Sequence, residues 1–139
     1  MIEARTQEAI QSYVLDASAI LAWLQGESGG EIVEPLLNVA VMSSVNWAEV
    51  LQKSIARGVD IEGMRADVEA LGLQIKPFTT TDAELVAQLY QKTQPQGLSL
   101  GDRACLVLAQ QLNLPALTTD RDWGDLDCGD LGIEIQLIR

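Results

Sequence analysis

Short apolar runs alternate with longer amphipathic segments along this chain. The runs have the length and the Val, Leu and Ile content of strands, and they cover residues 12–16, 39–44, 73–78, 115–120 and 132–138. The segments between them have apolar residues at helical spacing, and they cover residues 18–25, 46–57, 60–71, 81–93 and 99–113. Strands separated by helices indicate an α/β class, with a mainly parallel central sheet flanked by helices in three α/β/α layers.

Glycines and small polar residues predict where these helices begin and end. Three helices are expected to stop at a glycine just past the periodic segment, namely at Gly26, Gly58 and Gly72. Ser18 is expected to open the first helix, and Thr81 or Asp82 to cap a later one. Pro35 interrupts a short helical stretch over residues 31–38.

The length and composition are those of one soluble globular domain. The chain has 139 residues, of which 47% are hydrophobic and 21% charged. Residues 1–12 are expected to form an N-terminal extension or tail, and residues 13–139 a single domain. Neither a secretion signal nor an apolar run of membrane-spanning length is present, so we expect a cytoplasmic protein. Cys105 and Cys128 form no CxxC pair, and Cys105 is expected to be buried.

The charge balance restricts the possible chemistry. The chain contains no histidine, which removes the commonest general base and ordinary His-ligated zinc sites. The formal net charge of −11 disfavours nucleic-acid attraction by the overall field. A nucleic-acid function therefore has to depend on a local site.

Four acids are predicted to gather at one edge of the sheet. Asp16 and Asp120 end the first and fourth strands, while Glu49 and Asp102 fall in the first turns of two helices. In a parallel α/β sheet, strand carboxyl ends and the following helix N-termini share one edge, which is where such folds bind ligands.

Each acid taken alone also has an ordinary structural explanation. Asn46 with Glu49, and Ser99 with Asp102, both have the spacing of a capping box. Asp16 and Asp120 could be turn aspartates. Taken together, crowded like charges repel one another unless a cation lies between them. Oxygen-only ligands suit Mg²⁺ or Mn²⁺, and carboxylate-held Mg²⁺ is suited to phosphodiester cleavage.

Four motifs in series resemble those of the PIN-domain nucleases, with the closest likeness to the VapC-type toxins of type II toxin–antitoxin pairs. The resemblance runs from about Tyr13 onward and is carried by VLDASA from residue 14, SVNWAEV from residue 44, LGDRAC from residue 100 and LTTDRDW from residue 117. It implies a PIN-like fold and a metal-dependent endoribonuclease, a hydrolase that cleaves RNA with Mg²⁺ or Mn²⁺. It also implies a homodimer and a cognate antitoxin that blocks the site.

The resemblance assigns roles to individual residues. The catalytic and metal-binding acids would be Asp16, Glu49, Asp102 and Asp120. The supporting residues would be Ser18 and Thr118, which supply hydroxyls, and Asp122, a second acid near the fourth position. RNA binding would depend on basic residues near the edge, for which a solvated surface role is the alternative: Lys53, Arg57, Arg103 and Arg121. Trp23 and Trp47 are expected to pack in helices or to form part of a dimer or antitoxin surface, and Trp123 is expected to support its loop and not to stack on a base.

Three other classes fit the sequence less well. An aspartyl-phosphate phosphatase needs a second acid two residues after Asp16, where this chain has Ser18. A receiver-like, non-enzymatic Mg²⁺-binding domain needs a late lysine, but no lysine follows Lys92. A silent PIN binding module would not need all four acids.

Overall fold

Five short strands form one parallel sheet in the computed structural model, which describes residues 11–126 and 131–139. The strands are β1 (Tyr13–Leu15), β2 (Ala40–Ser43), β3 (Gln74–Lys76), β4 (Ala116–Thr118) and β5 (Ile135–Leu137). Their order is β3-β2-β1-β4-β5, and every neighbouring pair is parallel. The predicted α/β class with a parallel sheet is confirmed.

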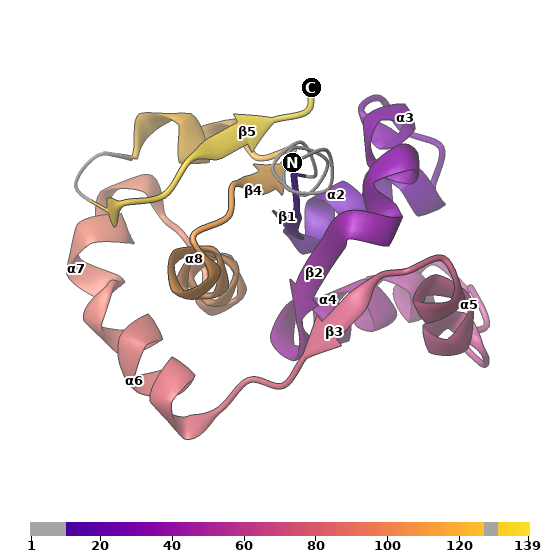
Figure 1. Cartoon of the computed structure of the whole chain (residues 1–139), viewed down its shortest axis with the longest axis horizontal. Coiled ribbons are helices and arrows are strands. Elements are labelled where there is room, and N and C mark those ends of the chain that lie inside the picture. The colour runs from indigo at the N-terminus through magenta and orange to yellow at the C-terminus, as the bar shows by residue number, and fades with distance from the viewer. Residues whose placement is uncertain (1–10, 127–130) are drawn as a thin grey trace, which may run out of the picture.

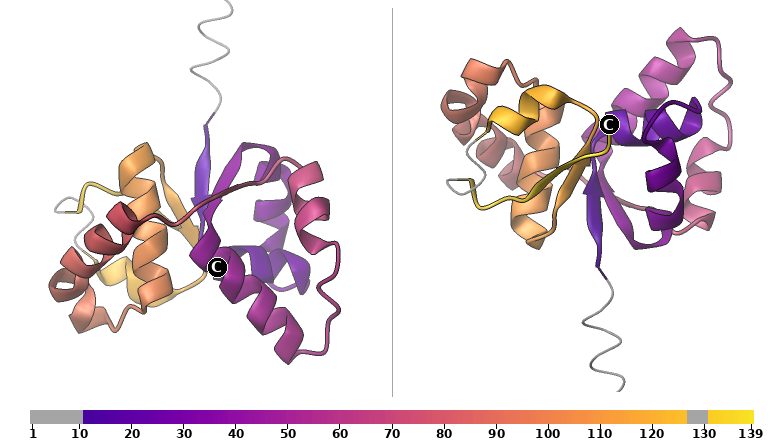
Figure 2. Two further views of the ribbon diagram at one scale, coloured as in Figure 1. Left: turned by 90° about the horizontal axis from the view of Figure 1, so that it is seen from below. Right: turned by 90° about the horizontal axis from the view of Figure 1, so that it is seen from above.

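Helices cover both faces of this sheet and complete three layers (Figures 1 and 2). One face is covered by α2 (Ala17–Leu24), α3 (Gly30–Val33), α4 (Ser44–Ala56) and α5 (Met64–Ala70). The other is covered by α6 (Thr80–Gln88), α7 (Tyr90–Thr93) and α8 (Leu100–Leu112). The 3-10 segments are η1 (Glu34–Val39), η2 (Gln94–Gln96) and η3 (Arg121–Asp125).

The neighbouring central strands β1 and β4 are apolar because both of their faces are buried. Val14 packs into the core on the α8 side, and the next residue, Leu15, packs into the core on the α2 side. Ala116 and Leu117 divide between the same two cores. This alternation explains why these strands read as continuous apolar runs and not as alternating ones.

The path of the chain through the sheet brings β1 and β4 together at their carboxyl ends. After β1 the chain builds β2 and β3 to one side, and then returns to place β4 on the other side of β1. Leu15 is in register with Leu117. The residues following these two, from Asp16 and Thr118, therefore lie side by side at the switch point, the usual ligand-binding place in such sheets.

The predicted helix ends are confirmed, but several predicted starts are wrong. Gly26, Gly58 and Gly72 each follow a helix and have positive φ. The first helix begins at Ala17 with Asp16 as its N-cap, so Ser18 does not open it. The N-cap of α6 is Thr79, whose hydroxyl accepts a hydrogen bond from the Asp82 amide. Neither Thr81 nor Asp82 is therefore the cap.

The largest correction concerns α4. Its N-cap is Ser43, whose hydroxyl accepts from the Val45 amide, and the helix begins at Ser44. Asn46 is therefore inside the helix, and the predicted Asn46–Glu49 capping box does not exist. Glu49 therefore lies in the second turn of α4, where the helix dipole contributes little to stabilising a negative charge.

Three further segments differ from the prediction. The helix expected over 60–71 starts only at Met64, because Gly63 before it adopts a positive φ. The helix expected over 81–93 breaks at Leu89 into α6 and α7. The stretch containing Pro35 divides into α3 and η1, with the proline in the first turn of η1.

Two remaining expectations concern the ends of the chain and membranes. Residues 1–10, most of the expected N-terminal extension, and Cys128 lie outside the described residues. Across the residues that the structure describes, no helix has the length and apolarity needed to cross a membrane.

Candidate functional site

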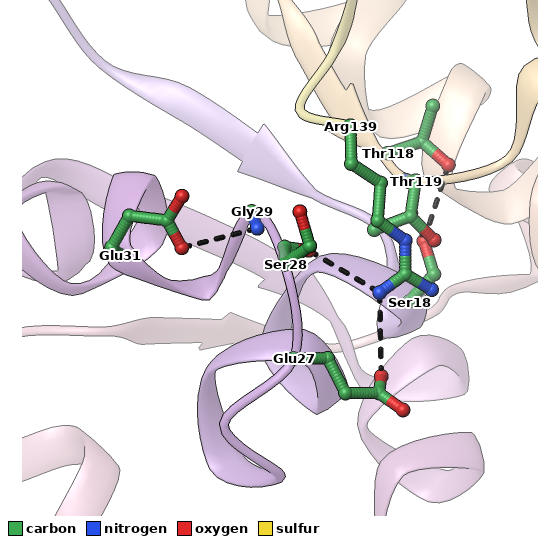
Figure 3. Close-up of polar contacts among 8 residues, drawn as sticks. All are labelled: Ser18, Glu27, Ser28, Gly29, Glu31, Thr118, Thr119 and Arg139. Carbon is green, nitrogen blue, oxygen red and sulfur yellow. Dashed lines mark hydrogen bonds and ion pairs between the residues drawn. The ribbon is translucent and has the colours of Figure 1, made fainter.

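Asp16 is buried at the carboxyl end of β1 and serves no capping role. Its side chain is only 4% exposed and accepts no hydrogen bond from the α2 backbone, although it occupies the N-cap position. Instead, Oδ2 accepts hydrogen bonds from Ser18 Oγ (2.7 Å) and Thr118 Oγ1 (3.0 Å). The two hydroxyls lie 3.2 Å apart and contact each other (Figure 3). The predicted supporting positions of Ser18 and Thr118 thus place them directly on Asp16.

Glu49 is joined to α8 by Asn46. The Asn46 side-chain amide is fully buried and donates to Glu49 Oε1 (2.9 Å) and to the Gly101 carbonyl (2.9 Å). Asn46 and Glu49 are three residues apart and share one face of α4. This bridge holds the Glu49 carboxylate against the first turn of α8, next to Asp102.

Gly101 leaves space for the Glu49 carboxylate. A Cβ at residue 101 would overlap both carboxylate oxygens of Glu49. The glycine therefore serves close approach of a side chain, and its backbone needs no unusual φ.

Asp102 does cap its helix, as the spacing from Ser99 predicts. Ser99 Oγ accepts from the Asp102 amide, and Asp102 Oδ2 accepts from the Ser99 amide. Thr79 and Asp82 form the same capping box at the start of α6. Because the two capping boxes are chemically alike, a comparison of Asp102 with Asp82 separates the effect of helix capping from the effect of position in the fold.

The pKa values of these two aspartates move in opposite directions. Burial raises the pKa of Asp102, the negative charge of Asp120 adds to this, and the hydrogen bonds from Ser99 only partly oppose it. For Asp82, burial is outweighed by hydrogen bonds from Thr79 and Gln111, so its pKa is lowered. Asp102 is a capping residue placed in an acidic environment.

Asp120 faces this environment more directly than Asp122 does. Its Oδ1 accepts from the Asp122 amide (2.9 Å), and its own amide donates to Thr118 Oγ1 (3.0 Å). Asp120 is half-buried and acts electrostatically on Asp102, whereas Asp122 is exposed. These contacts favour Asp120 as the fourth acid, with Asp122 ordering its turn through the backbone.

Electrostatics connects the four acids into one group. Burial raises the pKa of Asp16 to about 6, and the charges of Asp102 and Glu49 contribute to the rise. Beneath them lies Cys105, fully buried as predicted, whose thiol pKa is raised by burial and by the same three carboxylates. The fourth acid joins the group through its effect on Asp102.

The acids share this edge without converging on one point. Among residues 11–126 and 131–139, no three acidic side chains are close enough together to form a ready metal-binding group. In each of the four, the hydrogen bonds from described residues go to a single carboxylate oxygen. The other oxygens accept none from the described residues: Asp16 Oδ1, Glu49 Oε2, Asp102 Oδ1 and Asp120 Oδ2. Such a donor set, oxygen only and mutually repulsive, fits Mg²⁺ or Mn²⁺.

The four predicted RNA-binding residues fall into two kinds. Arg103 has a structural role, because its guanidinium donates to the Val86 carbonyl (2.9 Å) and lies over the Tyr90 ring. Lys53, Arg57 and Arg121 are exposed, and Lys53 lowers the pKa of Asp102 through its charge.

The tryptophans agree with their predicted structural roles. Trp47 and Trp123 are buried, and Trp23 packs against the core on the α2 side. Trp123 is fully enclosed and has no face on which a base could stack.

Sequence reasoning missed the bridging role of Asn46 and the participation of Arg139. Asn46 was predicted as a cap, and the signal for its true role is its spacing of three residues from Glu49 along one helix face. Arg139 hydrogen bonds to the Ser28 carbonyl and pairs with Glu27 (Figure 3). No local pattern predicts this contact, which joins residues 111 positions apart.

This fold and its acidic edge define a PIN domain, and the chain belongs to that family, whose model matches residues 13–127. Among curated proteins, it is similar to "VapC ribonuclease Mb2780c" of Mycobacterium bovis, with 29% identity over 129 residues, covering 82% of this chain and 95% of the relative. The "Ribonuclease VapC42" of Mycobacterium tuberculosis matches with the same identity and coverage.

Solved structures share the fold. A toxin–antitoxin complex from Klebsiella pneumoniae contains a chain that aligns with a TM-score of 0.69 at 18% identity, covering 92% of this chain and 98% of the other. A chain of the DNA-bound VapBC from Salmonella typhimurium aligns with a TM-score of 0.65 at 17% identity, covering 94% and 100%.

Proposed function

We propose that this chain is a metal-dependent endoribonuclease that hydrolyses RNA phosphodiester bonds, and that it acts as the toxin of a toxin–antitoxin pair. The observation that carries the proposal is the buried Asp16, at the N-cap position of α2 but not capping it, with Glu49 and Asp102 close enough to raise its pKa. Burying a carboxylate beside two other negative charges destabilises the folded protein, and nothing in the fold itself requires it. The names of the curated relatives, which are ribonucleases, support the same activity.

In this proposal, Asp16, Glu49, Asp102 and Asp120 hold Mg²⁺ or Mn²⁺. When bound, such a cation supplies an activated water and stabilises negative charge on the phosphate. The protein contributes the position of the carboxylates. Ser18 and Thr118 fix the Asp16 carboxylate through Oδ2, and Asn46 fixes Glu49 through Oε1. Because the site contains no histidine, the acids themselves must direct any water that attacks the phosphate.

The proposed partners follow from the solved neighbours, which are toxin–antitoxin complexes. We infer that a cognate antitoxin covers the acidic edge of this chain and that the chain forms a homodimer. A basic side chain of the antitoxin would complement the acidic edge electrostatically. Cytoplasmic localisation is part of the same proposal.

The test is cleavage of a labelled RNA by the purified chain. Cleavage is expected with Mg²⁺ or Mn²⁺ and is expected to stop when EDTA is added. Expression without the antitoxin should arrest growth of a bacterial host, and Asp16→Ala should relieve the arrest. Cleavage that persists in EDTA, or equal growth arrest by Asp16→Ala and the unmodified chain, would contradict the mechanism. A folded protein that binds Mn²⁺ but cuts no RNA would instead be a silent binding module.

A further inference from the structure

A cavity adjoins the acidic edge, and the charged side chains that line it are mainly basic. Its volume is about 390 Å³, and it lies between α2, the end of α4, and the chain that follows β5. Its charged lining consists of Lys53, Arg57, Arg139 and Glu27. Three of the nine basic residues of a chain with net charge −11 therefore surround one cavity.

We propose that this cavity binds a backbone phosphate of RNA next to the phosphodiester that is cut, with Lys53, Arg57 and Arg139 as its ligands. The proposal rests on the function proposed above and adds to it the place where the substrate strand leaves the acidic edge. Lys53 and Arg57 form no ion pair or side-chain hydrogen bond with any residue that the structure describes. Their charges are therefore available to an anion.

Arg139 is held in position over the cavity. Its Nη1 donates to the Ser28 carbonyl (3.2 Å) and lies 3.5 Å from Glu27 Oε1 (Figure 3). The chain after β5 can pass this close because residue 29 is a glycine with a φ of 95°. A Cβ at that position would lie 2.7 Å from the Ile138 carbonyl oxygen. Since Glu27 is already paired with Arg139, it does not neutralise Lys53 or Arg57.

The cavity and the acidic edge share a wall of two residues, Ser18 and Thr119. Ser18 Oγ donates to Asp16 and accepts from the Thr119 amide (3.0 Å). Only one hydroxyl thus separates the carboxylate from the cavity. Lys53 comes from α4, the helix that also carries Glu49, and it lines the cavity. A strand with one phosphate at the acids would place a neighbouring phosphate here.

The position of two of these bases at the end of α4 has another explanation, which is incomplete. Cations near a helix carboxyl end are stabilised by the helix dipole. That effect accounts for Lys53 and Arg57 but not for Arg139, which comes from a different part of the chain and is held by its own contacts. The convergence on one cavity favours phosphate recognition.

The experiment measures binding of a fluorescein-labelled, eight-nucleotide single-stranded RNA by fluorescence anisotropy, with EDTA present so that the RNA stays intact. Arg57→Gln and Arg139→Gln are each expected to weaken binding about tenfold. The slope of log K against log salt should fall by about 0.7 for each lost phosphate contact. The matched control is Arg65→Gln, an exposed arginine on α5 whose only ion pair among the described residues is with Glu69. This control should bind RNA like the unmodified chain.

The outcomes separate this inference from the proposed function. RNA cleavage by the unmodified chain, together with RNA binding by Arg57→Gln and Arg139→Gln equal to that of Arg65→Gln, overturns the phosphate cavity and leaves the nuclease intact. No RNA cleavage and no RNA binding by the unmodified chain overturn both. An eight-residue polyglutamate peptide that binds more tightly than the RNA, and loses affinity in the same variants, assigns the cavity to an acidic protein segment and overturns the RNA assignment.

Discussion

The carboxylate of Glu49 occupies the space that any side chain at residue 101 would need. This relationship between α4 and α8 depends on Asn46, which donates one hydrogen bond to each partner. Asn46 Oδ1 is buried and has no partner among the described residues, a cost that is tolerated at this position. We interpret the arrangement as a device that holds Glu49 at the acidic edge.

Gly101→Ala is therefore expected to reduce RNA cleavage strongly while changing stability little. The added methyl group displaces the flexible end of Glu49 and meets no backbone atom among its three nearest contacts, so the carboxylate can rotate away without unfolding the protein. We expect at least a hundredfold loss in kcat/KM, about 3 kcal/mol of transition-state stabilisation.

The matched control for this change is Gly124→Ala. A Cβ at residue 124 makes only an ordinary contact of 3.6 Å with Leu137. Cleavage should stay near the level of the unmodified chain. Comparable activity of the two alanine variants would show that the position of Glu49 does not matter to the reaction.

Asp16→Asn should stabilise the metal-free protein at neutral pH and abolish cleavage. Burial raises the pKa of Asp16 from 3.8 to about 6, so the folded state takes up a proton that the unfolded state has released between these values. Ionised Asp16 therefore destabilises the fold fully above about pH 6 and not at all below about pH 3.8. A shift of this size corresponds to about 3 kcal/mol.

The measurement is urea unfolding of both proteins in EDTA from pH 4.5 to pH 8. The advantage of Asp16→Asn in free energy of unfolding should grow as the pH rises and level off above about pH 6. The asparagine retains an oxygen that can accept from Ser18 and Thr118, so the comparison isolates the charge. A difference that does not change with pH would contradict the assigned cause.

The sequence could predict those parts of the fold that depend on local patterns. Apolar runs located all five strands, and glycines located three helix ends, because the chain needs a positive φ there. The start of α4 was misplaced because Ser43 is at once the last residue of β2 and the cap of the next helix. Ser43, Ser44 and Asn46 offered three possible caps within four residues, and local pattern could not choose among them.

The sequence could nominate residues for the candidate site, but it could not predict their interactions. Asp16 and Asp102 are found from strand ends and helix starts, which are local features. The position of Glu49 against Gly101, and the contact of Arg139 with Ser28, depend on how distant elements pack. Only the folded structure brings such partners together.

Mn²⁺ should raise the unfolding temperature of the unmodified chain, and EDTA should reverse the effect. A cation that binds only the folded state stabilises it by about 2.7 kcal/mol at one hundred times its Kd. Glu49→Gln should reduce this stabilisation, because it removes one charged donor. Glu84→Gln, which changes an exposed acid on α6, should respond to Mn²⁺ like the unmodified chain. An identical Mn²⁺ response in Glu49→Gln would remove Glu49 from the set of metal ligands.

Asp102→Asn and Asp82→Asn together distinguish helix capping from chemistry. Each aspartate accepts from the amide of its N-cap residue at 2.9 Å, and each amide donates to the hydroxyl of that residue. An asparagine oxygen can keep the first bond without the charge. We therefore expect both variants to fold, with losses in the free energy of unfolding of at most about 1 kcal/mol.

Only Asp102→Asn should lose RNA cleavage, because only Asp102 lies beside Asp120 and Asp16. Cleavage and urea unfolding measured on the same preparations provide the comparison. If both variants retain cleavage, Asp102 is a capping residue alone, and the acidic edge must work without it. If both lose cleavage in proportion to lost stability, the shared capping box explains the result. Loss confined to the α8 variant at matched stability assigns the Asp102 carboxylate to the reaction, because capping is the property that the two positions share.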